Sequence, residues 1–387
     1  MSSGWGRLGG LVVCGSLLLA ACAAPVADRL APTTTRATSP PVAAPTTAVP
    51  ATVASTRPRY PAAFGVGIRT VTFVDPSRPT LDYADTPPQV LSPRRVLRTT
   101  IRYPTLEPGK GLLPGAPPAT AFGPFPVVVF AHGFAVTPHT YEPLLDSWVR
   151  AGFVVVAPLF PVDNYYAWVA QGRGDASEAD IWNEPEDLAV VVRDLVPLAR
   201  QRGSFLNGLL DTSRVALAGQ SDGANVVGAL LFADSFAAVR ATLPVRPRAA
   251  LLLSGAEIGA GVPYQAASAS LSVLSTESTT DYCNSTQDAT TLYDAVAPGA
   301  AHHLFLVLDG ATHLGPYDGA VPWFPVVRRV TTKFLEMALS VRHRPATLST
   351  VQEVGERAGV ATLLTSAAVS LPATGDTGDC GVSTPYP

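Results

Sequence analysis

The sequence predicts an α/β protein with a mostly parallel, eight-stranded sheet and helices on both of its faces. The first observation is that short apolar runs alternate with longer stretches of helical apolar spacing between residues 60 and 345. Such alternation is typical of parallel strands joined by helices. The second is composition: the 387 residues are 47% hydrophobic and 15% charged, with a net charge of -3. This balance supports one large core and excludes a surface for nucleic acid, so we expect no nucleic-acid partner.

The individual elements follow from these apolar runs. Strands are expected at residues 66–73, 96–103, 126–131, 153–157, 214–218, 249–254, 271–275 and 304–308. Helices are expected at residues 141–151, 185–200, 223–234, 285–296 and 322–341. We therefore place one folded domain at residues 60–345, followed by a C-terminal extension, residues 346–387, that packs on it.

The N-terminus predicts a secreted, lipid-anchored protein. Arg7 is followed by an uncharged apolar run that is too short to span a bilayer but fits the core of a signal peptide, residues 1–21. The end of this run, Leu19-Ala20-Ala21-Cys22, resembles the lipobox of bacterial lipoproteins. The resemblance implies that Cys22 is acylated and that the protein lies on the extracytoplasmic side of the cell membrane. The alternative is an ordinary signal peptide that is cut nearby.

The segment after this signal, residues 22–59, is rich in Ala, Pro and Thr and has few large apolar side chains. Such a segment cannot bury enough surface to fold, so we expect a disordered tether. Contact with the membrane is then expected only through the lipid anchor, and the domain is expected to be a monomer.

The cysteines predict one disulfide. Cys14 lies in the expected signal peptide and Cys22 would carry the lipid, which leaves Cys283 and Cys380 in an oxidising compartment. We expect these two residues to form a disulfide bond.

A G-x-S-x-G pattern, residues 219–223, follows the strand at 214–218 directly and precedes the helix at 223–234. A sharp turn from strand to helix holds a serine in a strained conformation with its hydroxyl exposed, and glycines at both ends remove side chains that would collide. The pattern predicts that Ser221 is the nucleophile of an acyl transfer.

A nucleophilic serine needs a histidine base that is oriented by a carboxylate. Among the six histidines, His313 alone follows the end of a predicted strand. Loops at the carboxyl ends of parallel strands meet at one edge of a sheet, where Ser221 is also expected. The same argument allows Asp281 or Glu257 as the acid, and Glu277 is also expected close behind the strand at 271–275. We favour Asp281 because a disulfide at Cys283 would stiffen its loop.

The developing oxyanion needs two N–H donors. Asp222 follows the nucleophile and supplies one of them, and Phe134, in the His132-Gly133-Phe134 segment after the strand at 126–131, is expected to supply the second. The alternative is that His-Gly only turns the chain. Because a charged Asp222 would oppose the oxyanion, we expect its carboxylate to point away or to be paired.

The substrate cleft is less well defined by the sequence. Aromatic residues that could line an apolar cleft, or simply belong to the core, are Phe134, residues 165–168, Tyr317 and Trp323. Residues 163–184 could form a small cap. We find no metal-ligand cluster and no phosphate-binding glycine loop, so neither a metal nor another cofactor is expected.

Together these motifs resemble the α/β-hydrolase superfamily, especially its bacterial polyester-hydrolase, chlorophyllase and dienelactone-hydrolase-like branches. The resemblance covers residues 125–340 and rests on four segments in the order of the superfamily: residues 126–134, 182–188, 219–223 and 309–313. One departure concerns the acid, because relatives often have Gly-x-x-Asp where this chain has Thr276-Glu277-Ser278-Thr279-Thr280-Asp281.

The resemblance implies a serine hydrolase of carboxylic esters that forms an acyl-enzyme, with Ser221, His313 and Asp281 as its triad. Its partner is then an ester substrate. Two alternatives remain: an acyltransferase of the cell envelope that uses the same residues, and a surface-binding lipoprotein without catalytic activity.

Overall fold

The computed structural model describes residues 59–83, 86–170, 178–259 and 261–374. The predicted signal peptide, the predicted lipidation site Cys22, nearly all of the predicted tether and Cys380 lie outside these residues. Among the described residues, no helix is both long and apolar enough to cross a membrane.

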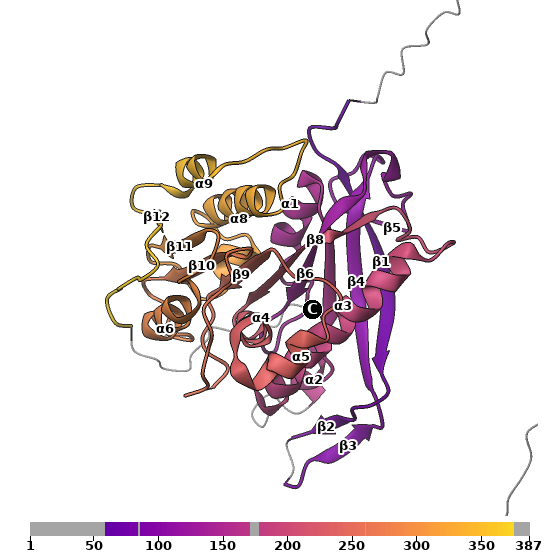
Figure 1. Cartoon of the computed structure of the whole chain (residues 1–387), viewed down its shortest axis with the longest axis horizontal. Helices are drawn as coiled ribbons and strands as arrows, with labels where there is room; N and C mark the ends of the chain where they lie inside the picture. The colour runs from indigo at the N-terminus through magenta and orange to yellow at the C-terminus, as the bar shows by residue number, and fades with distance from the viewer. Residues whose placement is uncertain (1–58, 84–85, 171–177, 260, 375–387) are drawn as a thin grey trace, which may run out of the picture. The chain divides into compact units, whose positions relative to one another are not determined.

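The described chain is built around a ten-stranded sheet in the order β12-β11-β10-β9-β8-β6-β7-β4-β1-β5 (Figure 1). The eight expected strands are all present: β1 (Gly65–Asp75), β4 (Arg95–Thr105), β6 (Phe125–Ala131), β7 (Val154–Leu159), β8 (Leu210–Gln220), β9 (Ala249–Leu253), β10 (Ser272–Ser278) and β11 (His303–Leu308). The expected number of eight was too low, because β5 (Leu112–Pro114) and β12 (Ala361–Leu364) extend the two edges. Both added strands are too short to produce a clear alternating pattern.

The centre of the sheet is parallel. Strands β6 to β11 pair in parallel, whereas β4 is antiparallel to both β7 and β1, and β12 is antiparallel to β11. The carboxyl ends of β6, β8, β9, β10 and β11 therefore point the same way. The loops that follow these strands can converge at one edge.

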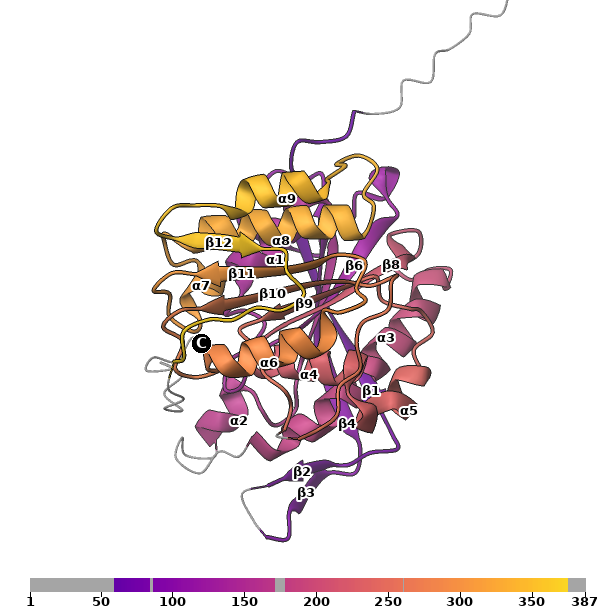
Figure 2. The same cartoon turned by 60° about the vertical axis from the view of Figure 1, so that its left-hand side comes forward.

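Helices cover both faces of the sheet (Figures 1 and 2). Val127 and Val129 of β6 belong to one core cluster, and Val128 and Phe130 belong to the other, because successive side chains point to opposite faces. The first cluster contains residues of α3 (Glu184–Arg200), α4 (Asp222–Phe232) and α6 (Thr286–Val296). The second contains residues of α1 (Glu142–Ala151), α8 (Phe324–Ala338) and α9 (Leu348–Gly355).

Five of these helices match the expected ones, and the structure adds short elements that the sequence analysis did not predict. They are the strands β2 (Thr80–Asp82) and β3 (Gln89–Ser92), the helices α2 (Tyr165–Ala170), α5 (Ala237–Ala241), α7 (Gly315–Asp318) and α9, and the 3-10 turns η1 (Thr120–Phe122), η2 (Glu178–Asn183) and η3 (Asp234–Phe236). The β2–β3 hairpin extends from the end of the β1–β4 pair (Figures 1 and 2).

The described part of the C-terminal extension is joined to the domain. Strand β12 pairs with β11 through residues 361–364. Further along, the backbone N–H of Thr374 donates to the Thr286 hydroxyl, and the N–H of Val369 donates to the Asp294 carboxylate. The edge strand thus comes from the segment that we had placed beyond the domain.

Candidate active site

The predicted nucleophile lies at a strained turn between β8 and α4. The backbone of Ser221 has φ 56° and ψ -128°, a conformation that residues other than glycine rarely adopt. A Cβ atom at Gly219 would collide with the carbonyl oxygen of Gly223, and one at Gly223 would collide with the carbonyl oxygen of Ala131. The G-x-S-x-G pattern is therefore required for this close approach of backbone segments.

The predicted base and acid meet in the loops after β11 and β10. The Nδ1 atom of His313 lies 2.7 Å from Oδ2 of Asp281, and both side chains are buried. Because the carboxylate accepts, Nδ1 carries the proton and Nε2 is left with its lone pair. The imidazole is thus held in the tautomer that a general base needs.

Asp281 is stabilised in its charged form. Its Oδ1 atom accepts hydrogen bonds from the backbone N–H groups of Cys283 and Asn284. Burial acts to raise the pKa of Asp281, but the hydrogen bond and the charge of His313, with the N–H of Cys283, lower this pKa below its usual value overall.

A second buried carboxyl, Glu277, lies behind Asp281. It belongs to β10, which ends at Ser278, and not to the loop after the strand as we expected from the sequence. Burial, followed by the charge of Asp281, raises the pKa of Glu277 well above its usual value. Oε1 of Glu277 accepts from the N–H of Ser278, while Oε2 has no hydrogen-bond partner among the described residues. A proton on Oε2 would allow neutral Glu277 to lie beside charged Asp281.

Ser221 and His313 line a common cavity of about 440 Å³. Its described lining includes both predicted oxyanion residues, Phe134 and Asp222. The rest of the described lining is Gly133, Val136, Tyr141, Glu178, Ile181, Gln220, Asn225, Ala256, Glu257, Ile258, Cys283, Asn284, Asp288 and Leu314. Asp222 begins α4, so its N–H is one of those without an intrahelical acceptor. The cavity thus brings together the nucleophile, the base and both expected oxyanion residues.

A chain of hydrogen bonds that the sequence analysis missed connects these parts. The N–H of Gly133 donates to the Tyr141 hydroxyl, which donates to Oε1 of Gln220 at 2.6 Å. The Gln220 amide donates to the backbone oxygen of His313 at 3.1 Å, and its Nε2 lies 3.4 Å from Nε2 of the imidazole. Gln220 is the residue before Ser221. Its place in the G-x-S-x-G pattern was the one sequence signal that could have indicated its position in the site.

His132 holds the loop that precedes Phe134. Its Nδ1–H donates to the carbonyl oxygen of Gly133 at 2.8 Å, and its Nε2 accepts from the N–H of Phe160 at 3.0 Å. Burial lowers the pKa of His132 to about 4. A neutral imidazole therefore connects the oxyanion loop to the end of β7.

We expected the Asp222 carboxylate to point away from the oxyanion or to be paired, and in the structure Asp222 lines the cavity with one long hydrogen bond. Its Oδ1 atom is 3.4 Å from the donor Nδ2 of Asn225, and Oδ2 has no hydrogen-bond partner among the described residues. Burial first, and the charge of Glu178 second, raise the pKa of Asp222 to about 7. This side chain is therefore largely neutral in acid and gains its charge around neutral pH.

The other cleft residues predicted from the sequence are divided between cavity and core. Phe134 lines the cavity. Glu257, the alternative acid, lines it too, but the carboxylate that is hydrogen-bonded to His313 is that of Asp281. Tyr317 is fully buried and its hydroxyl bonds to Ser254 and Thr276. The remaining aromatic candidates, residues 165, 166 and 168 and Trp323, are not among the described residues that line the cavity.

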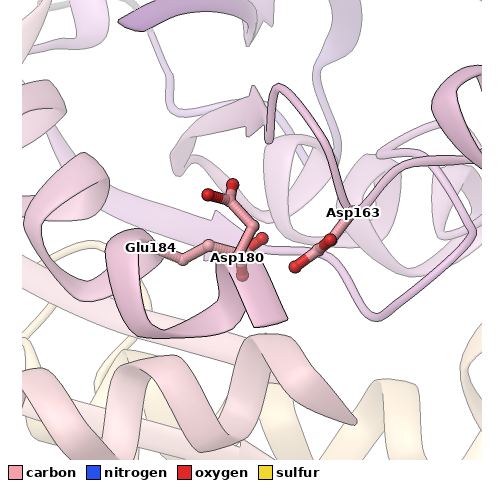
Figure 3. A group of neighbouring side chains, drawn as sticks. All are labelled: Asp163, Asp180 and Glu184. Atoms are coloured by element: carbon pink, nitrogen blue, oxygen red, sulfur yellow. The ribbon is translucent and has the colours of Figure 1, made fainter. Parts of the chain in front are cut away.

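Three further acids that were not selected from the sequence come together in the interior. Besides burial, the charge of Asp222 contributes to the raised pKa values of two of them, Asp163 and Glu184. Oxygen atoms of Asp163, Asp180 and Glu184 all lie within 4.8 Å of one another, a spacing that could hold a metal ion (Figure 3). Burial, with the charge of Asp180 next, raises the pKa of Asp163 to about 9. Burial followed by the charge of Asp163 raises the pKa of Glu184 well above its usual value. These residues belong to the segment expected to form a cap, of which residues 171–177 are not described.

Comparisons with known proteins support the fold. A family model described as chlorophyllase matches residues 94–246, a range that contains Ser221 but neither Asp281 nor His313. A search of curated proteins found no match. Among solved structures, a ferulic acid esterase from Streptomyces cinnamoneus is similar at 18% sequence identity and a TM-score of 0.51, over 75% of this chain and 94% of that one.

The matched segment contains the central strands and the nucleophile turn, and the structural similarity extends over most of the described chain. The chain therefore has an α/β-hydrolase type of fold, and residues 94–246 are similar to the chlorophyllase family.

Proposed function

We propose that the chain is a serine hydrolase that cleaves carboxylic esters through an acyl-enzyme. The observation that carries this proposal is the strained Ser221 in one cavity with His313, whose Nδ1 is 2.7 Å from Asp281. Strain at one position, and a charged acid buried against a single imidazole, are features of catalytic sites more than of ordinary cores.

In the first step, Nε2 of His313 accepts the proton of the Ser221 hydroxyl as Oγ bonds to the ester carbon. The carbonyl oxygen becomes an oxyanion and accepts hydrogen bonds from the N–H groups of Phe134 and Asp222. When the carbonyl re-forms, the bond to the alkoxy oxygen breaks and His313 gives its proton to the departing alcohol. Asp281 stabilises the imidazolium throughout.

In the second step, water replaces the alcohol. His313 accepts a proton from water as its oxygen bonds to the acyl carbon, and the proton then passes to Oγ of Ser221 when the acyl-oxygen bond breaks. The carboxylic acid leaves and the enzyme is restored. No oxidant, reductant or metal enters this balance.

The names of the similar proteins support an ester as the substrate. The family model is described as chlorophyllase, and the similar structure is a ferulic acid esterase. Both names denote proteins that act on esters, which agrees with the arrangement of Ser221, His313 and Asp281.

Charges in the cavity indicate which esters are preferred. The described lining holds four carboxyl groups, on Glu178, Asp222, Glu257 and Asp288, and no lysine or arginine. Neutral or cationic esters are therefore favoured over anionic ones, and a carboxylate product is repelled.

The direct experiment compares hydrolysis of p-nitrophenyl butyrate by wild type, Ser221→Ala and Ser235→Ala, whose exposed serine follows α4. We expect Ser221→Ala to lower kcat by a factor on the order of 10⁴ to 10⁶ and Ser235→Ala to leave it unchanged. A folded Ser221→Ala protein with wild-type turnover would contradict the proposal.

The charge preference is tested with a second substrate. A p-nitrophenyl hemisuccinate ester, with its added negative charge, is expected to have a lower kcat/KM than p-nitrophenyl butyrate.

The fate of the acyl group separates hydrolysis from transfer. Product analysis with added alcohols is expected to give the free acid as the main product. An acyl ester of the added alcohol as the main product would identify the acyltransferase instead.

We also propose that the chain is a bacterial lipoprotein that acts as a monomer outside the membrane, joined to it by Cys22, with Cys283 and Cys380 in a disulfide. The support is the lipobox-like sequence and the cysteine pattern. Mass spectrometry of the mature N-terminus and of peptides containing Cys283 is the test. An N-terminus without acyl chains would contradict the lipid anchor. Free thiols at Cys283 and Cys380 would contradict the disulfide.

A further inference from the structure

The group formed by Asp163, Asp180 and Glu184 lies outside the proposed reaction. Asp163 follows β7, Asp180 is in η2 and Glu184 begins α3, and Figure 3 shows the three side chains close together. None of the three is among the described residues that line the cavity of Ser221. Asp163, Asp180 and Glu184 are 2%, 0% and 1% exposed, so solvent does not hydrate their carboxyl groups.

The neighbouring arginines are engaged by other carboxylates. Arg95 is buried and donates to both oxygens of Asp180 and both oxygens of Asp187. Arg78 donates to Asp75 and Asp187. These two guanidinium groups therefore balance at most two of the negative charges, and neither donates to Asp163 or Glu184.

Three buried oxygens in the group are left without hydrogen-bond partners among the described residues. They are both carboxylate oxygens of Asp163 and Oε1 of Glu184. An unpaired carboxylate in the interior is strongly disfavoured, so buried charges in proteins are paired or coordinate metals. Two carboxylates with free oxygens match the charge of one divalent cation.

The chemistry of the donors selects the cation. Three carboxylates offer only oxygen, which suits Ca²⁺ or Mg²⁺ and not the metals that prefer nitrogen or sulfur. Two oxygens in one Ca²⁺ shell can be as far apart as about 5 Å, and one oxygen of each of the three residues lies within 4.8 Å of the others. Asp180 is fixed by Arg95 and by Asn183 Nδ2 at 2.8 Å, and Ca²⁺ tolerates such imposed geometry better than Mg²⁺ does.

We propose that Asp163, Asp180 and Glu184 form a Ca²⁺ site that joins the loop after β7 to the beginning of α3. Oδ1 of Asp180 accepts from both Arg95 and Asn183, whereas Oδ2 accepts from Arg95 alone and keeps a second lone pair for the ion. The bound ion would hold η2 in place, and η2 supplies Glu178 and Ile181 to the wall of the active-site cavity. The site is independent of the proposed reaction, since binding is measured without a substrate.

The test uses the full chain after treatment with EDTA and removal of the chelator. Equilibrium dialysis with CaCl₂ is expected to give one Ca²⁺ per chain, and 1 mM CaCl₂ is expected to raise Tm by several degrees, because a ligand that binds only the folded state stabilises it. The same concentration of MgCl₂ is expected to have a smaller effect. No binding and no rise in Tm would overturn the proposal and leave protons as the neutralising species.

Variants locate the ion. The double variant Asp163→Asn with Glu184→Gln is expected to weaken Ca²⁺ binding at least 100-fold and to lose the rise in Tm. The matched control, Glu186→Gln, removes a half-exposed carboxylate from the same helix and is expected to bind like wild type. Should the double variant not fold, Asp163→Asn alone is expected to weaken binding at least tenfold. Unchanged affinity in a folded variant would overturn the assignment.

Discussion

Asp281 and Asp163 are both buried carboxyl groups that follow strands of the same sheet, yet their environments act in opposite directions. Asp281 accepts from His313, Cys283 and Asn284, and its pKa is lowered. Asp163 has no hydrogen-bond partner among the described residues, and its pKa is raised to about 9. Burial alone therefore does not decide the charge of a carboxyl group: the donors that surround it do.

The largest contrast is expected in turnover. Asp281→Asn should lower kcat by about 10⁴, because an amide favours the wrong tautomer of His313. Asp163→Asn should change kcat by less than about tenfold, since Asp163 is not among the described residues that line the cavity. Steady-state kinetics on p-nitrophenyl butyrate measure both, and equal losses in the two variants would remove the distinction.

The second contrast concerns stability around the Asp163 group. Arg95→Met should lower the free energy of unfolding by about 3 to 5 kcal/mol, because Asp180 and Asp187 then lose their buried partner. Arg98→Met, at an exposed position of the same strand, should change it by less than about 0.5 kcal/mol. Urea unfolding gives both values, and similar effects of the two substitutions would show that the buried ion pairs contribute little.

A third prediction tests the acid behind Asp281. The pKa of Glu277 is raised in the folded protein, so above pH 4.5 the folded state holds a proton that the unfolded state has released, and its contribution to stability falls as the pH rises. Glu277→Gln should remove a slope of up to about 1.4 kcal/mol per pH unit from that window. The measurement is unfolding in urea from pH 5 to pH 8. A difference between the proteins that does not vary with pH would contradict a neutral Glu277.

The smallest effect is expected at Asp222, which gains its charge around pH 7 beside the oxyanion. The ratio of kcat for Asp222→Asn to that for wild type should rise by about fivefold between pH 5.5 and 8.5, which corresponds to about 1 kcal/mol. Taking the ratio cancels the titration of other groups. A constant ratio would mean that this carboxylate does not act on the transition state.

The sequence was informative where local chemistry sets the structure. Continuous apolar runs identified the buried parallel strands, and the glycines around Ser221 identified the strained turn, because both signals lie within a few neighbouring residues. The expected positions of His313 and Asp281 followed from the rule that loops at the carboxyl ends of strands meet. Their roles in catalysis stay predictions until activity is measured.

The sequence was uninformative where contacts between distant segments decide. Strand β12 is four residues long and forms by pairing with β11, and Glu277 was placed in a loop because its strand is longer than the apolar run. Asp163 and Glu184 lie 21 residues apart without a known ligand spacing. Tyr141 and Gln220 were missed because their hydrogen bond joins the residue before α1 to the end of β8, and the spacing of neighbouring residues does not indicate such a contact.

The most direct test of the central claim is intact-mass analysis after treatment with a fluorophosphonate, which reacts with activated serines. Wild type is expected to gain one adduct, located at Ser221 by peptide mapping. Asp163→Asn is expected to be labelled like wild type, and Ser221→Ala to gain none. A folded wild-type protein that stays unlabelled, or an adduct that persists in Ser221→Ala, would contradict the assignment of Ser221 as the activated nucleophile.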